Sequence, residues 1–294
     1  MFWASLRYIS PLGVGIAVFL QVMTQLLINF QWYWLGKISG FSLSFWKVLE
    51  INCRGSCIEA IAPGVKAGGE ITRVVLLSRV LEGSKKKALF LVGQQKMFSL
   101  SAFFLLLLVS VNTAVFEIDG GIRNVFNKTG VFLLGLGIVI FGFSKIFSPG
   151  FKFPLTKAAR GRKYFFGHPL KGGMGQIQVL GMAFLSLVIW LIYPAKLYLL
   201  VRSLIPGASY FFLSAATLLS YLAGLLPIFP GGVGGFEGVM AYFLTVQGLG
   251  FSEALAVALV FRFITFWLVV IVSTLLLYVP MRRKNYEKKV GFFT

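Results

Sequence analysis

Residues 230–238 read Pro-Gly-Gly-Val-Gly-Gly-Phe-Glu-Gly and place one acid among glycines, between two strongly apolar runs. The surrounding composition is that of an integral membrane protein. Of the 294 residues, 57% are hydrophobic, and the mean hydropathy is +0.85, whereas soluble domains have roughly 45–50% apolar residues. Water is absent from the bilayer core, so a glycine-rich helix break is tolerated there only inside protein or beside a polar cavity. We therefore take residues 230–238 as a candidate site.

Five other apolar runs are long enough, or nearly so, to cross a membrane as helices. A bilayer core of about 30 Å needs about 20 helical residues. The runs show neither the alternation of barrel strands nor a heptad repeat. We therefore predict an all-α polytopic membrane protein in which residues 1–294 form a single transmembrane domain. The predicted spans are residues 11–35, 88–111, 130–147, 176–200 and 252–279.

Two more segments, residues 45–81 and 210–248, are apolar but interrupted by proline and glycine. The first break reads Pro-Gly-Val-Lys-Ala-Gly-Gly-Glu at residues 63–70 and shares the pattern Pro-Gly-x-x-x-Gly-x-Glu with residues 230–237. The distances from each break to the neighbouring spans are also nearly the same in the two halves. Inverted repeats with discontinuous helices are typical of secondary transporters, and the paired breaks indicate the binding site.

This pattern predicts an inverted repeat of span, re-entrant broken hairpin and span. The first copy is residues 11–111 with its hairpin at 45–81. The second copy is residues 176–279 with its hairpin at 210–248. A connecting transmembrane helix at 130–147 inverts the second copy relative to the first.

Basic residues gather at three places beside the apolar runs: Lys85–Lys87, the loop at 148–175 and the tail at 280–294. Excess Lys and Arg mark the cytoplasmic side of a membrane. We therefore predict that all three places, the C-terminus included, are cytoplasmic, and that the N-terminus lies outside if both hairpins are re-entrant. The net charge of +19 then reflects orientation and contact with anionic headgroups, and nucleic acid is not an expected partner.

The two breaks suit an anion. A Pro-Gly break leaves the first amides of the next half-helix unpaired and points the positive end of its dipole into the membrane, where a phosphate fits. Arg73, Lys96 and Arg262 can add charge-assisted bonds. Glu70 and Glu237 lie early in their half-helices, so each either caps its own helix or binds a cationic headgroup or a coupling proton. The predicted substrate-binding residues are Glu70, Arg73, Lys96, Glu237, Arg262, Gly64, Gly68, Gly231, Gly232, Gly234 and Gly235, and the predicted helix breaks are Pro63 and Pro230.

Structural roles compete with these assignments. Each charge at mid-bilayer costs about 2.5–3.5 kcal/mol on the insertion scale, so Arg73 can instead form a structural pair with Glu70. Lys37 and Lys196 are expected to snorkel to an interface, whereas Arg262 lies near mid-depth of its span. Three amides share one face of the first span and are expected to point into the bundle: Gln21, Gln25 and Asn29.

Catalysis has little support in the sequence. His168 is the only histidine, no cluster has metal-ligand spacing, and no serine elbow occurs. Cys53 and Cys57, four residues apart, suit neither a disulfide nor a complete metal site and are expected to be small packed residues. We predict no catalytic residue, no metal and no cofactor.

The first break followed by Arg73, and residues 230–238 followed by Arg262, resemble the lysylphosphatidylglycerol synthase transmembrane-region family. These flippase-like membrane domains also occur as stand-alone proteins, and the resemblance covers nearly the whole chain. It implies a bundle with two re-entrant hairpins that moves lipids between leaflets. In relatives the lipids include aminoacylated phosphatidylglycerol, and polyprenyl-phosphate lipids are candidates for stand-alone members. By match, the expected site comprises Pro63, Gly64, Gly68, Glu70, Arg73, Pro230, Gly231, Gly235, Glu237 and Arg262.

Two departures from the family pattern limit this resemblance. No aminoacyl-transferase domain follows residue 294 in this sequence, so lipid synthesis is not carried over. Gln94-Gln95-Lys96 stands where many relatives would show an acidic and basic pair early in the third span, so a coupling role is not carried over there.

The leading hypothesis is a non-enzymatic flippase or transporter for an anionic, phosphate-bearing lipid in a prokaryotic cytoplasmic (inner) membrane. The lipid would be a phospholipid, an aminoacyl-phospholipid or a polyprenyl-phosphate-linked lipid. One alternative is an integral-membrane transferase acting on a lipid-phosphate sugar, with Glu70 or Glu237 as general base. Another is a non-transporting subunit of an envelope lipid or glycan synthesis enzyme. The expected partners are anionic membrane lipids and, as a candidate, a lipid-synthesising enzyme; the sequence leaves the oligomeric state open.

Overall fold

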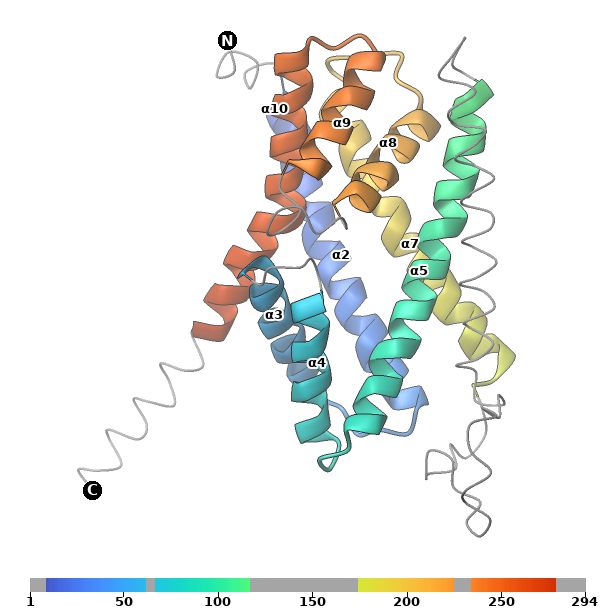
Figure 1. Ribbon diagram of the computed structural model, residues 1–294, viewed down its shortest axis with the longest axis vertical. Helices are drawn as coiled ribbons and strands as arrows, with labels where there is room; N and C mark the ends of the chain where they lie inside the picture. Colours follow the sequence, from blue (N-terminus) through green and yellow to red (C-terminus); the bar gives the residue numbers. More distant parts are fainter. Residues whose placement is uncertain (1–8, 62–66, 117–173, 225–233, 279–294) are drawn as a thin grey trace, which may run out of the picture.

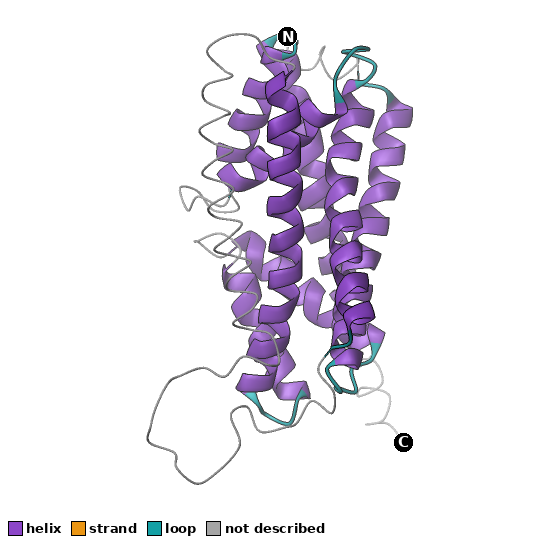
Figure 2. Cartoon of the chain, turned by 90° about the vertical axis from the view of Figure 1, so that its right-hand side faces the viewer, coloured by secondary structure: helices purple, strands orange, loops and turns teal. Residues whose placement is uncertain are grey.

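The computed structural model describes residues 9–61, 67–116, 174–224 and 234–278, and these residues form helices joined by short loops (Figure 2). Within these ranges, four helices are long and apolar enough to cross a membrane. The helical fold class is therefore confirmed. The four are α2 (Pro11–Ile38), α5 (Lys85–Phe116), α7 (Gln176–Val201), and a helix that runs from Phe251 to Tyr278 and comprises α10 (Phe251–Arg262), the π-helical segment η3 (Phe263–Trp267) and a final α-helical part.

Two pairs of shorter helices enter the bundle from opposite ends (Figure 1). The first pair is α3 (Phe45–Ile61) and α4 (Ala67–Val80), and the second is α8 (Tyr210–Ala223) and α9 (Gly235–Val246). In Figure 1, the end of α3 and the start of α4 lie toward the middle of the bundle from one side, and the end of α8 and the start of α9 lie there from the other. Each half therefore has the order long helix, helical hairpin, long helix.

Local sequence explains where several helices begin. Ser10 precedes Pro11, and its hydroxyl accepts a bond from the amide of Gly13 at the start of α2. Ser209 caps α8 in the same way through the amide of Phe212. Serine is a preferred N-cap, and proline suits the first helical turn, whose amides have no helical partner.

Close backbone contacts hold the helices together. A β-carbon at Gly13 would lie 2.7 Å from the carbonyl oxygen of Leu199, so α2 and α7 touch there. Likewise, a β-carbon at Gly69 would lie 2.8 Å from the carbonyl oxygen of Gly55, which joins α4 to α3. Small residues let helix backbones approach closely. Close packing matters in membranes because van der Waals contact, rather than the hydrophobic effect, drives helix association there.

The described boundaries agree with most predicted ones. The spans expected at 11–35, 176–200 and 252–279 correspond to α2, α7 and the helix from Phe251 to Tyr278. Helix α5 is longer than expected, because it continues past residue 111 to Phe116. The connecting helix at 130–147, the basic loop at 148–173 and the tail from 279 lie outside the described residues. That the hairpins are re-entrant in a bilayer stays a prediction.

Candidate functional site

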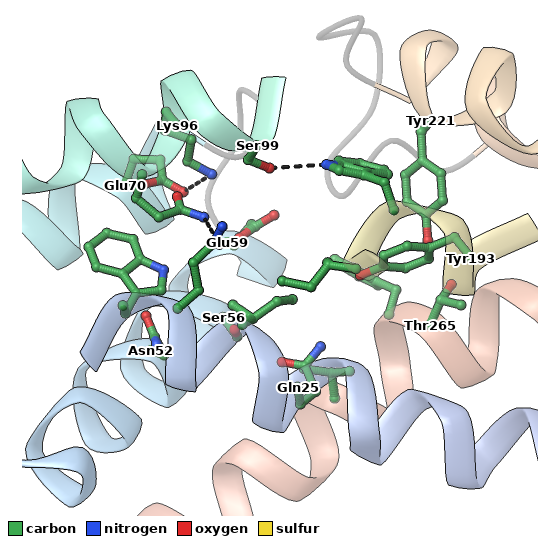
Figure 3. Close-up of a pocket in the computed structure, with 18 of the residues that line it drawn as sticks. Gln25, Asn52, Ser56, Glu59, Glu70, Lys96, Ser99, Tyr193, Tyr221 and Thr265 are labelled. Atoms are coloured by element: carbon green, nitrogen blue, oxygen red, sulfur yellow. Dashed lines mark hydrogen bonds and ion pairs between the residues drawn. The ribbon is translucent and has the colours of Figure 1, made fainter. Parts of the chain in front are cut away.

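A cavity of about 200 Å³ lies where the hairpins and the long helices meet (Figure 3). Its wall carries five charged side chains, several amides and hydroxyls, and five aromatic side chains. The charged residues are Glu59, Glu70, Arg73, Lys96 and Arg262; the amides and hydroxyls include Gln25, Gln31, Asn52, Ser56, Gln95, Ser99, Ser186 and Thr265; the aromatic residues are Trp32, Trp190, Tyr193, Tyr221 and Phe266.

Four of the charged side chains form one cluster on α3, α4 and α5. Glu70 Oε1 lies 2.5 Å from Arg73 Nη1 and 2.7 Å from Lys96 Nζ, and Arg73 Nη2 lies 3.6 Å from Glu59 Oε2. Arg73 crosses directly over Gly55, where a β-carbon would lie 2.7 Å from its Nε. The Lys96 side chain is 39% exposed, far more than the 11% of Arg73. Lys96 is therefore the cation of this cluster with the most freedom to meet a ligand.

Arg262 is fixed differently on the opposite side of the cavity. Its Nε lies 3.6 Å from Glu237 Oε1, and both side chains are only 7% exposed. The guanidinium carbon also sits 4.5 Å from the ring centre of Phe236 and 4.6 Å from that of Phe266. Stacking on rings and pairing with a carboxylate both favour a buried guanidinium. The start of η3 follows immediately, and π-helical segments are frequent at functional sites.

Glu237 both caps its helix and pairs with Arg262. Its Oε2 accepts a bond of 2.8 Å from the amide of Gly234, and its Oε1 faces Arg262. Gly234 has φ +88°, a conformation that favours glycine. Glu237 therefore has the capping role that the sequence offered, and the same carboxylate also pairs with Arg262. The Gly234 amide, predicted to bind an anion, is already bonded to this carboxylate.

The structure brings the charged candidates together and leaves some glycines undescribed. Glu70, Arg73, Lys96 and Arg262 line the same cavity, and Glu237 lies behind Arg262. Arg73 and Glu70 do form the ion pair considered as the structural alternative. Gly68 and Gly235 lie in the first turns of α4 and α9. Outside the described residues lie Pro63, Gly64, Pro230, Gly231 and Gly232.

One sequence prediction was wrong. Lys196 does not snorkel: its side chain is fully buried, its Nζ donates to Gln21 Oε1, and it lies 4.1 Å from the ring centre of Tyr193. The amide of Gln21 in turn donates to the carbonyl oxygen of Thr265 in η3. Lys196 points into the bundle because Gln21, from the other half of the chain, provides a buried hydrogen-bond acceptor there.

Sequence reasoning missed the neutral part of the site. The face carrying Gln21, Gln25 and Asn29 was expected to point into the bundle, and Gln21 and Asn29 are indeed buried while Gln25 lines the cavity. Gln31, Gln95 and the aromatic wall were not assigned to the site. Apolar surroundings make an isolated glutamine in a span informative, because an amide is expensive in lipid; this signal could have identified Gln31.

The bundle and its buried polar cavity define a polytopic α-helical membrane protein. The family model described as the Lysylphosphatidylglycerol synthase TM region matches residues 1–273, and the chain belongs to this family. The family indicates a lipid-related function in the membrane. This confirms the resemblance drawn from the two Pro-Gly motifs.

Archaeal membrane proteins are among the similar proteins. A UPF0104 membrane protein of Methanocaldococcus jannaschii is 26% identical over 301 residues, covering 96% of this chain and 88% of the relative. A UPF0104 membrane protein of Methanothermobacter thermautotrophicus is 22% identical over 285 residues, covering 90% of this chain and 84% of the relative. The similarity therefore extends over nearly the whole bundle.

Proposed function

We propose that the protein is a flippase or transporter that moves an anionic, phosphate-bearing lipid between leaflets, without altering it chemically. The observation that carries the proposal is the cavity at which hairpins from opposite ends of the bundle meet, with Arg73, Lys96 and Arg262 on its wall. Guanidinium and ammonium groups bind phosphate through charge-assisted hydrogen bonds. The acyl or prenyl chains would stay in the bilayer while the headgroup passes through the cavity.

Partner exchange provides a route for the phosphate. Lys96 Nζ is held by Glu70 Oε1 at 2.7 Å, and Glu70 is also bonded to Arg73. A phosphate that takes Lys96 leaves Glu70 with Arg73, so no carboxylate is stranded without a cation. A buried carboxylate that lost every cation would be costly. The cluster can therefore release one cation to a ligand at low cost.

The proposal includes an orientation. The protein would lie in a prokaryotic cytoplasmic membrane, with the basic segments at Lys85–Lys87, 148–175 and 280–294 on the cytoplasmic side. The hairpins would be re-entrant, one open to each side. This orientation follows from the positive-inside rule and from the opposite entry of α3–α4 and α8–α9 (Figure 1).

Leaflet exchange in liposomes tests the proposal. We would reconstitute the purified protein with fluorescent or quenchable anionic phospholipids and polyprenyl phosphates and follow their movement between leaflets. Lys96→Gln and Arg262→Ala should each slow exchange by about tenfold or more, because each removes a charged hydrogen-bond donor. Lys37→Gln is the matched control, since Lys37 is exposed and does not line the cavity.

Three results would count against the proposal. If no anionic lipid exchanges faster than in protein-free liposomes, transport is wrong, and a non-transporting subunit becomes the better explanation. A covalently changed lipid recovered from the liposomes would favour the transferase. Full exchange rates in both Lys96→Gln and Arg262→Ala would mean that the cavity is not the lipid path.

A further inference from the structure

We infer that the cavity selects a hydroxyl-bearing headgroup, a sugar or polyol attached to the lipid phosphate. This inference rests on the proposed function for the phosphate and concerns the neutral wall of the same cavity. Two hydrogen-bond relays end on that wall, and both end in an oxygen that can only accept. A phosphodiester has no hydrogen to donate, so the phosphate alone does not satisfy these oxygens.

The first relay fixes the orientation of Gln95. The hydroxyl of Ser186 donates to the carbonyl oxygen of Met182 at 2.9 Å, so its remaining capacity toward Gln31 is to accept. Gln31 must then present its Nε2, which donates to Ser186 Oγ, and its Oε1 accepts from Gln95 Nε2 at 3.1 Å. The far atom of the Gln95 amide is therefore the oxygen Oε1.

Gln95 Oε1 has no hydrogen-bond partner within the described part of the chain, although its residue is only 6% exposed and lines the cavity. A buried acceptor without a donor is unfavourable. A donor that reaches this oxygen from the cavity would remove that cost. The side chain thus favours a ligand that brings a hydrogen to donate.

The second relay has the same polarity. Asn29 Nδ2 donates to the carbonyl oxygen of Phe45 at 3.4 Å, and Asn29 Oδ1 accepts from Asn52 Nδ2 at 3.0 Å. Asn52 lines the cavity, so it too contributes an amide oxygen. Both relays start on a backbone carbonyl, which only accepts, and this anchor sets the direction of every bond that follows.

Neutral acceptors beside aromatic rings suit hydroxyl groups better than an ammonium group. The carboxylates that would attract an ammonium, Glu59 and Glu70, already face Arg73 and Lys96. Trp190 and Tyr193, whose ring centres lie 5.3 Å apart, also line the cavity and can contact the carbon skeleton of a polyol. A site built to bond hydroxyls rejects analogues that lack them, because its own polar groups would be left unpaired.

Matched lipids test this selectivity. Phosphatidylglycerol and phosphatidylpropanol carry the same charge and nearly the same headgroup, but only the first has hydroxyls; phosphatidylinositol distinguishes a ring polyol from glycerol. Binding to detergent-solubilised protein and leaflet exchange in liposomes are both measured. We expect at least one hydroxyl-bearing lipid to bind and exchange about tenfold or more better than phosphatidylpropanol.

The variants provide an internal control. Gln95→Met should lower the ratio of phosphatidylglycerol to phosphatidylpropanol binding and exchange toward one, and this ratio rather than either absolute value is the readout. Gln94→Met is its matched control: Gln94 is equally buried, but it contacts Ser39 and Met174 and does not line the cavity. If Gln95→Met fails to fold, Asn52→Leu tests the second relay in the same way.

The outcomes separate this inference from the proposed function. Equal binding and exchange of all three lipids by the wild-type protein would show that water satisfies the two amide oxygens, which overturns the headgroup inference and leaves transport standing. Hydroxyl-dependent binding without exchange of any lipid would support the headgroup inference and overturn transport. If both Gln95→Met and Asn52→Leu still prefer hydroxyl-bearing lipids over phosphatidylpropanol, the two relays do not determine headgroup selectivity.

Discussion

Replacing Glu237 tests whether its two interactions contribute separately to stability. Glu237→Gln keeps an acceptor for the Gly234 amide, because glutamine also occupies this position in capping boxes, but it removes the charge 3.6 Å from Arg262 Nε. Glu237→Ala removes both interactions. An N-terminal cap contributes about 1 kcal/mol. Removing one member of a buried ion pair costs about 3–5 kcal/mol.

Arg262 also stacks on Phe236 and Phe266; we expect this stacking to persist in both variants, which places the loss for Glu237→Gln near the lower end of that range. We expect a decrease in the free energy of unfolding of about 3 kcal/mol for Glu237→Gln and about 4 kcal/mol for Glu237→Ala. Both variants should still fold if the total stability is within the usual range of about 5–15 kcal/mol.

The assay is reversible unfolding of the purified protein in mixed micelles with increasing SDS, followed by tryptophan fluorescence. Glu253→Gln is the matched control, because Glu253 accepts from the Gly250 amide at the same place in α10 but is only half-buried. Its loss should stay within about 0.5 kcal/mol. A Glu237→Gln protein as stable as the wild type would refute a contribution from the ion pair, and equal losses in the two Glu237 variants would refute the cap.

Three further predictions use the same unfolding assay. Gly13→Ala should lower the free energy of unfolding by about 1–3 kcal/mol, because its β-carbon would lie 2.7 Å from a carbonyl oxygen of α7. Gly15→Ala is the control: its β-carbon would meet nothing within 4 Å, so the change should be neutral or stabilising by up to about 1 kcal/mol. Equal effects of the two substitutions would contradict the close contact between α2 and α7. Gln21→Leu should lower the free energy of unfolding by about 2 kcal/mol, because it leaves the buried Lys196 amino group without its acceptor, and adding Lys196→Met should recover most of that loss. Gly234→Ala should cost about 1–2 kcal/mol, because φ there is +88°, and an unchanged stability would mean that this backbone relaxes freely.

Most helices could be predicted because their signals are local in the sequence. Apolar length defines the spans, and proline with glycine defines the breaks. The end of α5 was missed for an equally local reason: Asn112 and Thr113 look like loop residues, yet their side chains bond to the carbonyls of Leu108 and Val109 and stay within the helix. Polar side chains that bond back to the preceding turn do not end a helix.

The charged part of the site could also be predicted, because an ionisable residue at membrane depth is energetically costly and therefore usually lies in a site or in an ion pair. Apart from the local pair of Arg73 with Glu70, the partners of these charged residues could not be predicted. Glu59 and Lys96 approach Arg73 and Glu70 only once α3, α4 and α5 pack together. Lys196 bonds to Gln21 from the opposite half of the chain, and no local sequence pattern predicts a contact between residues so far apart in the chain.

The repeat predicts two equivalent acidic ends, but the structure makes them unequal. Glu70 is shared between Arg73 and the half-exposed Lys96, whereas Glu237 is held by the amide of its own helix and by a deeply buried Arg262. Breaking the second arrangement leaves a buried charge, while the first can give up Lys96 and keep a pair. We therefore expect rearrangement on ligand binding to occur at the first hairpin, while the start of α9 with Glu237, and Arg262 beside it, form the more rigid side of the cavity.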